Sequence, residues 1–180
     1  PFSMMASRER RIECARLVVE MQHYFAEMIA ERRKHPRDDF ISEALAYRDT
    51  SGESFDMQEL MTLITIDLLA SGNETTTAAI GSGIKLLLED PAAMEALAQN
   101  PALVPVAIEE MLRLESPVQG MFRECAHAAN IGEVGFAKGD LLNIRFGSAN
   151  RDEARYDHAE RLDFQRKKPG SHLAFGIGRH

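Results

Sequence analysis

Residues 57–89 constrain the fold of this chain more than any other segment. Asp56 and Glu59 form a capping-box-like start for a helix, and Asp90-Pro91 ends it. The first half of the segment is apolar on every side of such a helix, which is typical of a helix in a protein interior. The sequence therefore predicts a long, centrally buried helix over residues 57–89.

Further helices are expected on both sides of this segment. Residues 8–34 carry apolar side chains at three- and four-residue spacing, and a proline follows soon after them. Asp38 or Asp39 can cap a shorter helix. Asn100-Pro101 starts a helix over residues 101–115, which a Ser-Pro pair ends.

After Pro117 the sequence changes character. Residues 121–147 contain short alternating runs separated by glycines, a pattern typical of small strands. Residues 148–171 are polar and irregular, and so long an irregular stretch in a compact domain is usually functional. The sequence predicts a mainly α fold with a small β region, in one partial domain over residues 1–180 whose last part, residues 148–180, is a long loop.

Composition narrows the class of protein. The chain has 180 residues, of which 44% are hydrophobic and 27% charged, which is typical of a soluble globular domain. A net charge of -7 argues against broad binding to nucleic acid or to an anionic membrane. Two cysteines form no disulfide framework, no signal-peptide pattern is seen, and the apolar run Leu60–Ala70 is too short to span a membrane. We expect a cytoplasmic protein.

One local cluster of basic residues departs from the acidic balance. It consists of Arg32, Arg33, Lys34 and Arg37. The cluster has two interpretations, a docking site for an acidic partner and a solvated helix end, and the second is the more common use of such a charge run.

The predicted central helix contains an unusual run, Gly72-Asn73-Glu74-Thr75-Thr76. Glycine costs up to about 1 kcal/mol in a helix interior, and β-branched threonines add smaller penalties. One explanation is structural, with Gly72 permitting close helix packing and the threonine hydroxyls bonding to helix carbonyls. The functional explanation is that Gly72 lets a flat ligand approach the backbone while the Thr75 hydroxyl locally opens the helix.

The helix over residues 101–115 contains Glu110 and Arg113, which lie on one helical face at i and i+3. On an exposed helix such a pair contributes only about 0.3 kcal/mol and carries almost no information. Its meaning depends on the motifs around it.

The last residues, Phe175-Gly176-Ile177-Gly178-Arg179-His180, complete an ordered set of motifs with the central-helix run, the Glu-x-x-Arg pair and Ala149-Asn150-Arg151-Asp152. In this order the set resembles the C-terminal part of a soluble, bacterial-type cytochrome P-450, a haem-thiolate monooxygenase. In that family the last motif continues x-Cys-x-Gly, and the cysteine binds the haem iron. The resemblance covers about residues 32–180.

The resemblance implies roles for individual residues. Glu74 and Thr75 would be the acid-alcohol pair that helps to deliver protons to bound dioxygen, and Gly72 would let haem approach the helix. Arg123 and His180 would bind the haem carboxylates. The pair of Glu110 and Arg113 would be buried, with Arg161 as its third member. Substrate would lie near Asp67, Ala70, Ser71, Val118 and Gln119.

The resemblance also implies haem b as cofactor and insertion of one atom of dioxygen into a small organic substrate. The electrons would come from a ferredoxin or a flavoprotein, and neither nucleic acid nor a membrane is an expected partner. Because Cys14 and Cys125 lie outside the ligand motif, we expect the 180 residues alone to be inactive. A haem-free truncated remnant, or a non-catalytic helical binding module, is the alternative. Ser71, Glu153 and His158 depart from residues common in the family.

Overall fold

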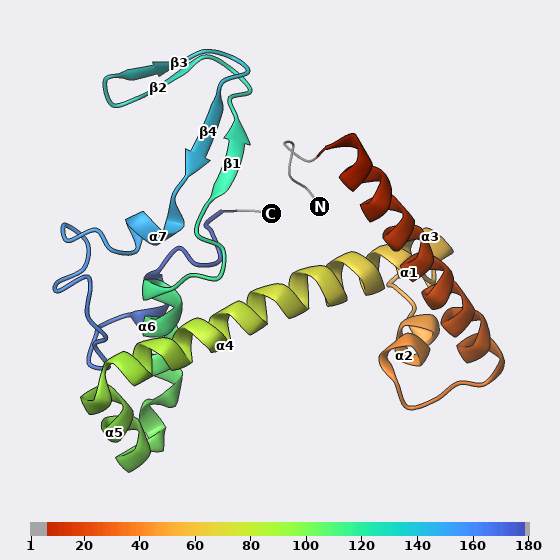
Figure 1. Cartoon of the computed structure of the whole chain (residues 1–180), viewed down its shortest axis with the longest axis horizontal. Helices are drawn as coiled ribbons and strands as arrows, with labels where there is room; N and C mark the ends of the chain where they lie inside the picture. The colour runs from red at the N-terminus through yellow and green to blue at the C-terminus, as the bar shows by residue number, and fades with distance from the viewer. Residues whose placement is uncertain (1–6, 179–180) are drawn as a thin grey trace. The chain divides into compact units, whose positions relative to one another are not determined.

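A computed structural model describes residues 7–178 of the chain (Figure 1). The chain groups into two compact units, Pro1–Glu74 and Thr75–His180. The prediction of one partial domain stays a prediction.

The first unit consists of helices with side-chain caps. It contains α1 (Arg8–Lys34), α2 (Phe40–Ala46) and α3 (Met57–Thr62). Ser7 caps α1 and Asp39 caps α2, so Asp39 rather than Asp38 is the cap. Asp56 and Glu59 form the expected capping box. These caps satisfy amide groups that have no partner inside their helices.

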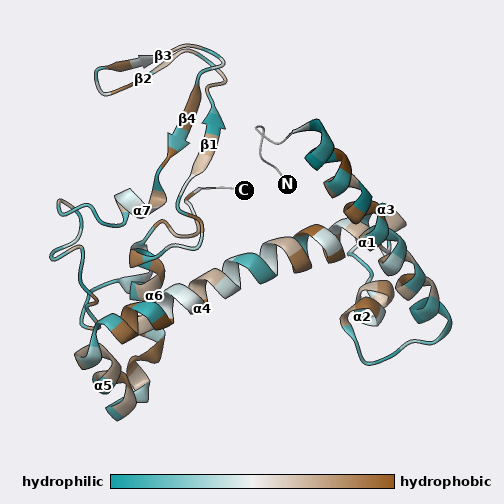
Figure 2. Ribbon diagram, in the orientation of Figure 1, coloured by the Kyte–Doolittle hydropathy of each residue, from teal (hydrophilic) through white to brown (hydrophobic). Residues whose placement is uncertain are grey.

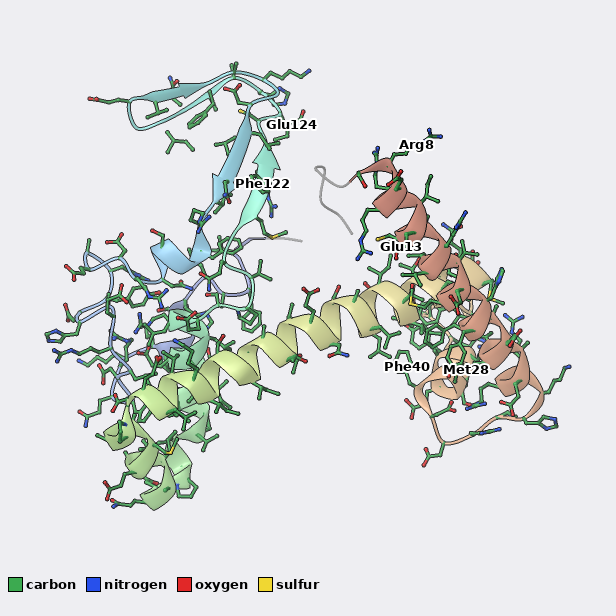
Figure 3. All side chains as sticks on the ribbon, viewed as in Figure 1. Arg8, Glu13, Met28, Phe40, Phe122 and Glu124 are labelled. Atoms are coloured by element: carbon green, nitrogen blue, oxygen red, sulfur yellow. The ribbon has the colours of Figure 1, made fainter. Side chains whose placement is uncertain are left out.

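A small hydrophobic core joins the helices of this unit. Its buried members are Ile29, Ile41, Ala44, Leu60 and Ile64. Met28 of α1 packs against this cluster, while Phe40 at the start of α2 is partly exposed (Figure 3). Figure 2 shows α1 as mostly hydrophilic, with hydrophobic residues at intervals, as expected for a helix that buries one side.

The predicted helix over residues 57–89 is continuous but not uniform. A π-helical segment, η1 (Leu63–Ser71), lies between α3 and α4 (Gly72–Glu89). The Thr62 and Thr65 hydroxyls donate to the carbonyls of Gln58 and Met61, at 2.9 and 2.7 Å. Such bonds compete with the regular helix ladder. The π-helical distortion therefore lies before Gly72. The sequence instead predicts a local opening of the helix at Thr75.

The burial of this helix differs from the prediction. Ile64 and Thr65 are buried, but Ile66, Leu68 and Leu69 are exposed in the 180-residue chain. Figure 2 shows hydrophobic residues recurring along this helix. The predicted apolar side chains are present, but within the described residues 7–178 Ile66, Leu68 and Leu69 are not buried.

In the second unit, α4 packs against the Glu-x-x-Arg helix. Helices α5 (Pro91–Gln99), η2 (Pro101–Leu103) and α6 (Val104–Leu114) follow, and Asp90 and Asn100 cap α5 and η2. A Cβ atom at Gly83 would lie 2.9 Å from the Met111 sulfur. Gly83 thus allows α4 and α6 to approach closely.

Four short strands form two antiparallel ribbons. Strands β1 (Met121–Glu124) and β4 (Leu141–Ile144) pair with Phe122 opposite Asn143. Between them lies a hairpin of β2 (Ala129–Ile131) and β3 (Val134–Phe136), turning at Gly132 with φ of 59° (Figure 1). Phe122 and Glu124 share one side of β1 (Figure 3), so Arg123 lies on the other.

The final segment has little regular structure. It contains only α7 (Phe146–Ala149) and the short turn η3 (Pro169–Ser171) within the described residues. The predicted fold class, mainly α with a small β region, is confirmed. Over residues 7–178, no helix is long and apolar enough to cross a membrane.

The pKa of Asp39 provides a test of the first unit. A hydrogen bond from the Arg32 guanidinium, at 2.5 Å, and the amide of Ser42 lower the pKa of this carboxyl from 3.8 to about 2. The contribution of the carboxylate to stability is therefore complete above pH 3.8 and is lost as the pH falls toward 2. We expect Arg32→Gln to raise the Asp39 pKa, measured by carboxyl NMR titration. Arg33→Gln is the matched control and should leave it unchanged; the same pKa in both variants would contradict the assignment.

Candidate functional site

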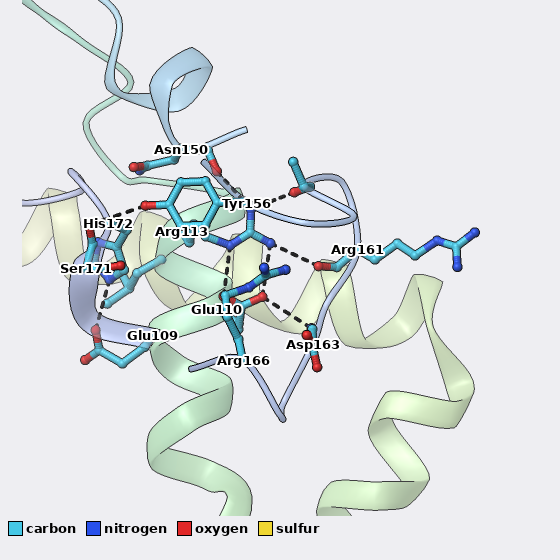
Figure 4. Close-up of polar contacts among 12 residues, drawn as sticks. Glu109, Glu110, Arg113, Asn150, Tyr156, Arg161, Asp163, Arg166, Ser171 and His172 are labelled. Carbon is cyan, nitrogen blue, oxygen red and sulfur yellow. Dashed lines mark hydrogen bonds and ion pairs between the residues drawn. The ribbon is translucent and has the colours of Figure 1, made fainter. Parts of the chain in front are cut away.

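A buried ion pair lies at the centre of the second unit. Glu110 and Arg113 come from successive turns of α6, and both side chains are 0% exposed. The Arg113 Nε donates to Glu110 Oε1 at 2.9 Å, and Nη2 donates to Oε2 at 3.0 Å (Figure 4). This is the two-pronged geometry in which a guanidinium binds a carboxylate most strongly.

Arg113 also holds the long irregular segment. Its Nη1 donates to the main-chain carbonyls of Asn150 and Ala159, at 2.8 and 2.6 Å, and its Nη2 donates to that of Arg161 at 3.0 Å. These carbonyls belong to a stretch with little regular structure of its own. One side chain of α6 therefore supplies donors that a helix or sheet would otherwise provide.

Glu110 binds further donors from the same segment. Arg166 Nε donates to Oε1 at 2.9 Å, and the Asp163 amide donates to Oε2 at 3.2 Å. The Arg166 side chain is only 8% exposed. The guanidinium carbons of Arg113 and Arg166 lie 5.1 and 5.6 Å from the centre of the Tyr156 ring, within the range of cation–π attraction.

The prediction of Arg161 as third member of the ion pair is wrong for its side chain. The Arg161 guanidinium points away from the network (Figure 4), and only its carbonyl takes part. The second guanidinium on Glu110 belongs to Arg166. Sequence analysis did not single out Arg166, because local spacing gives no reason to prefer it over Arg161.

Asn150 extends the network toward the last motif of the chain. It is fully buried, and its Nδ2 donates to the Ser116 hydroxyl at 3.0 Å. Its Oδ1 accepts the amide of Leu173 at 2.7 Å. Asn150 thus connects the end of α6 to the segment that leads into Phe175–Gly178, a role that sequence analysis did not assign.

The expected central-helix residues lie together at the junction of η1 and α4. Gly72 and Glu74 are exposed and Thr75 is half-buried. The residues expected near substrate in this stretch, Asp67, Ala70 and Ser71, are also exposed. Their proposed roles depend on the resemblance and stay predictions.

The remaining expected residues surround β1. Val118 and Gln119 precede it and are exposed, and the Gln119 carbonyl accepts the Gly147 amide at 3.1 Å. Arg123 is exposed on β1 and bonds within its own strand, to the Phe122 carbonyl at 3.1 Å. Over residues 7–178 its guanidinium has no carboxylate partner. His180 lies outside the described residues.

The basic cluster is partly neutralised. Arg32 pairs with Glu31 and Asp39, and Arg37 pairs with Glu31 at 2.6 Å. This arrangement favours the interpretation as a charged helix end over a docking site for an acidic partner.

Three substitutions compare how much Arg113, Arg166 and Arg161 contribute to the stability of the fold. Arg113→Ala removes the five hydrogen bonds of a buried guanidinium, which leaves Glu110 with only one of its two arginines and three main-chain carbonyls without this donor, so we expect a loss of about 3–5 kcal/mol in the free energy of unfolding. Arg166→Ala should also destabilise, but less, because Arg113 still neutralises Glu110. Arg161→Ala is the matched control and should change stability by less than about 0.5 kcal/mol, because its carbonyl remains. Denaturant unfolding measures all three, and an Arg161→Ala loss equal to that of Arg113→Ala would refute this network.

Comparisons with known proteins identify the family. A family model described as Cytochrome P-450 matches residues 3–180. The chain is 40% identical over 167 residues to Cytochrome P-450 107B1 of Saccharopolyspora erythraea, covering 92% of this chain and 40% of that protein. It is 38% identical over 159 residues to Pentalenolactone synthase of Streptomyces exfoliatus, covering 86% of this chain and 39% of that protein.

Solved structures agree with this result. Cytochrome P-450 TbtJ1 is similar with a TM-score of 0.85 and 33% identity, over 96% of this chain and 45% of that one. The polyketide-synthase cytochrome P-450 PksS of Bacillus subtilis also gives 0.85, with 32% identity over 97% and 45%. The chain spans about two fifths of the length of the curated relatives it matches. Because the family model matches nearly all 180 residues, the chain belongs to the cytochrome P-450 family.

Proposed function

We propose that the chain is part of a haem-thiolate monooxygenase. The enzyme would insert one oxygen atom of dioxygen into a small organic substrate and reduce the other to water, consuming two electrons and two protons. The observation that carries the proposal is the buried network of Glu110, Arg113 and Arg166, because it fixes the segment leading into the last motif. Family membership supports the reaction class, and one relative is named Steroid C26-monooxygenase.

The residues around β1 and the last motif suit a haem. Arg123 offers a guanidinium that is not neutralised within residues 7–178, the natural partner of a haem carboxylate. Phe175 and Ile177 are 71% and 90% exposed and offer apolar surface to a flat ring. Gly176 and Gly178 have φ of 74° and 96°, which other residues rarely adopt, so the turn depends on them. By resemblance, Gly72 and His180 complete the haem-binding set.

The haem is proposed to be haem b, bound without covalent attachment. The 180 residues contain only Cys14 and Cys125, and neither belongs to a Cys-x-x-Cys-His attachment motif. A haem held through a cysteine thiolate supplies the electron density that favours cleavage of the O–O bond.

Glu74 and Thr75 are proposed to handle the protons. The Glu74 carboxyl is exposed and can exchange protons with solvent. The Thr75 hydroxyl, in the first turn of α4, is proposed to hold water that passes protons toward the reacting dioxygen. The π-helical turn before Gly72 supports this role, since such turns often occur at functional sites.

Asp67, Ala70, Ser71, Val118 and Gln119 are proposed to face the substrate. An acid among apolar groups is costly unless it is paired, so Asp67 would favour a polar or cationic substrate group. The alternative is that Asp67 faces water. Substrate-binding spectra of Asp67→Leu with a panel of amine, hydroxylated and hydrocarbon ligands decide between them, because an unchanged affinity order would exclude Asp67.

The electron donor is proposed to be a ferredoxin or a flavoprotein in the cytoplasm. Within residues 7–178, Gly176-Ile177-Gly178 does not follow a strand, as the glycines of a dinucleotide-binding motif would. The haem-free remnant or binding module considered from the sequence is not favoured, because relatives named as a cytochrome P-450, a synthase and a monooxygenase match over most of the chain.

The absorption spectrum of the full-length protein tests the proposed function. After reduction and addition of carbon monoxide, we expect the thiolate-type band that distinguishes this family from other haem proteins. An NAD(P)H-driven assay with a ferredoxin and its reductase then tests substrate oxidation. A protein that binds no haem after expression with a haem precursor would overturn the proposal.

Thr75→Ala tests the proton pathway separately from haem binding. We expect an unchanged thiolate-type band, about 10²-fold slower product formation and electron use diverted to released hydrogen peroxide, because general acid catalysis typically contributes 10²–10⁴-fold. Thr76→Ala, on the next residue of the helix, is the matched control. Unchanged coupling of electron use to product in Thr75→Ala would remove this hydroxyl from the mechanism.

A further inference from the structure

His172 lies buried between α6 and the last motif of the chain. Its side chain is 1% exposed, and its Nε2 lies 3.0 Å from Glu109 Oε2 (Figure 4). The amide of Ala174 donates to its Nδ1 at 3.2 Å. Because Nδ1 accepts that hydrogen bond, it carries no proton, so the proton of the neutral ring is on Nε2 and is donated to Glu109. The geometry therefore selects one tautomer.

The turn that follows His172 is held by neighbouring bonds. Asn150 Oδ1 accepts the Leu173 amide at 2.7 Å, and the Leu173 carbonyl accepts the Gly176 amide at 2.9 Å. The Tyr156 hydroxyl donates to the Ser171 carbonyl at 3.3 Å. The imidazole of His172 thus bonds both to Glu109 of α6 and to the amide of Ala174 in the turn.

The turn η3 leaves room for this contact. A Cβ atom at Gly170 would lie 3.1 Å from Glu109 Oε2 and would press on the carboxylate that orients His172. Glu109 and Glu110 are adjacent on α6 and so point in different directions around the helix. Glu110 binds the long irregular segment, and Glu109 binds the lead-in to the last motif.

We propose that His172 is a positioning residue for the haem-ligand loop, with Glu109 as the group that fixes its tautomer. The neutral imidazole accepts the Ala174 amide and so sets the turn over residues 173–176, from which the loop continues. The proposal depends on the proposed function for the identity of the loop, but not for the hydrogen bonds themselves.

Two substitutions at His172 each remove one of the two hydrogen bonds of the imidazole and keep the other. In His172→Asn, Oδ1 takes the place of Nδ1 and can accept the amide two residues on, but the side chain no longer reaches Glu109. In His172→Gln, the amide nitrogen takes the place of Nε2 and can still donate to Glu109, but no acceptor faces the Ala174 amide. Both variants are made in the full-length protein.

We expect His172→Asn to keep the thiolate-type band of the reduced, carbon-monoxide-treated protein and His172→Gln to lose most of it. Hydrogen exchange of the Ala174 amide should accelerate about tenfold in the Gln variant, the effect of losing one hydrogen bond. Glu109→Gln retains an acceptor for Nε2–H and is the matched control, with wild-type behaviour expected. A Gln variant with wild-type band and exchange would overturn the proposal.

If a variant does not fold, a measurement on the wild-type protein can still test the proposed tautomer of His172. The ¹⁵N shifts of the His172 ring report which nitrogen carries the proton, and we expect Nε2. Protonation at Nδ1 alone would overturn the proposal. If the proposed function fails instead, the wild type itself lacks the thiolate-type band, whereas the ring shifts and the Ala174 exchange still report on His172.

Discussion

The Arg113 guanidinium is the group on which the second unit depends. It makes five hydrogen bonds, two to Glu110 and three to main-chain carbonyls, which is the full number of donors that arginine has. A lysine offers three donors from a single point and cannot reproduce this planar arrangement. A fully buried charge is tolerated here because every donor of the guanidinium is used and the Glu110 carboxylate accepts two further hydrogen bonds, from the Asp163 amide and from Arg166.

This interaction explains how the segment after β4, which over residues 145–178 has only two short helical turns and no strand, takes a defined course. Buried carbonyls in such a segment lack partners within a helix or sheet, so side chains must supply them. Arg113 satisfies Asn150, Ala159 and Arg161, while Asn150 in turn orders Leu173. The ordering passes from α6 through the loop to the turn at Gly176. In the proposed enzyme, a rigid turn at this point is required because the metal ligand follows it.

Much of the local structure could be predicted from the sequence, because its causes are local. Asp39, Asp56 and Asp90 cap helices through amides three residues away, and glycine marks the hairpin at Gly132. The partners of Glu110 could not be predicted in the same way. Arg166 lies 56 positions from Glu110 in the sequence. That Arg166 rather than Arg161 binds Glu110 depends on how the loop folds over Tyr156. The π-helical segment was also missed, because threonine–carbonyl bonds leave no distinctive spacing in a sequence.

The two regions named by the motifs are stabilised in opposite ways. Around Glu110 and Arg113 almost every polar group is paired and buried, which favours a single rigid arrangement. From Leu63 to Thr75 the helix contains a π-helical segment, a glycine and two threonines, each of which weakens the regular helix. Sequences depart from local structural preference mainly where function requires it. A monooxygenase needs both properties, since its metal ligand must stay in place while the helix beside the reacting oxygen accepts water and substrate. The contrast between the two regions therefore supports the proposed division of roles between the loop and the central helix.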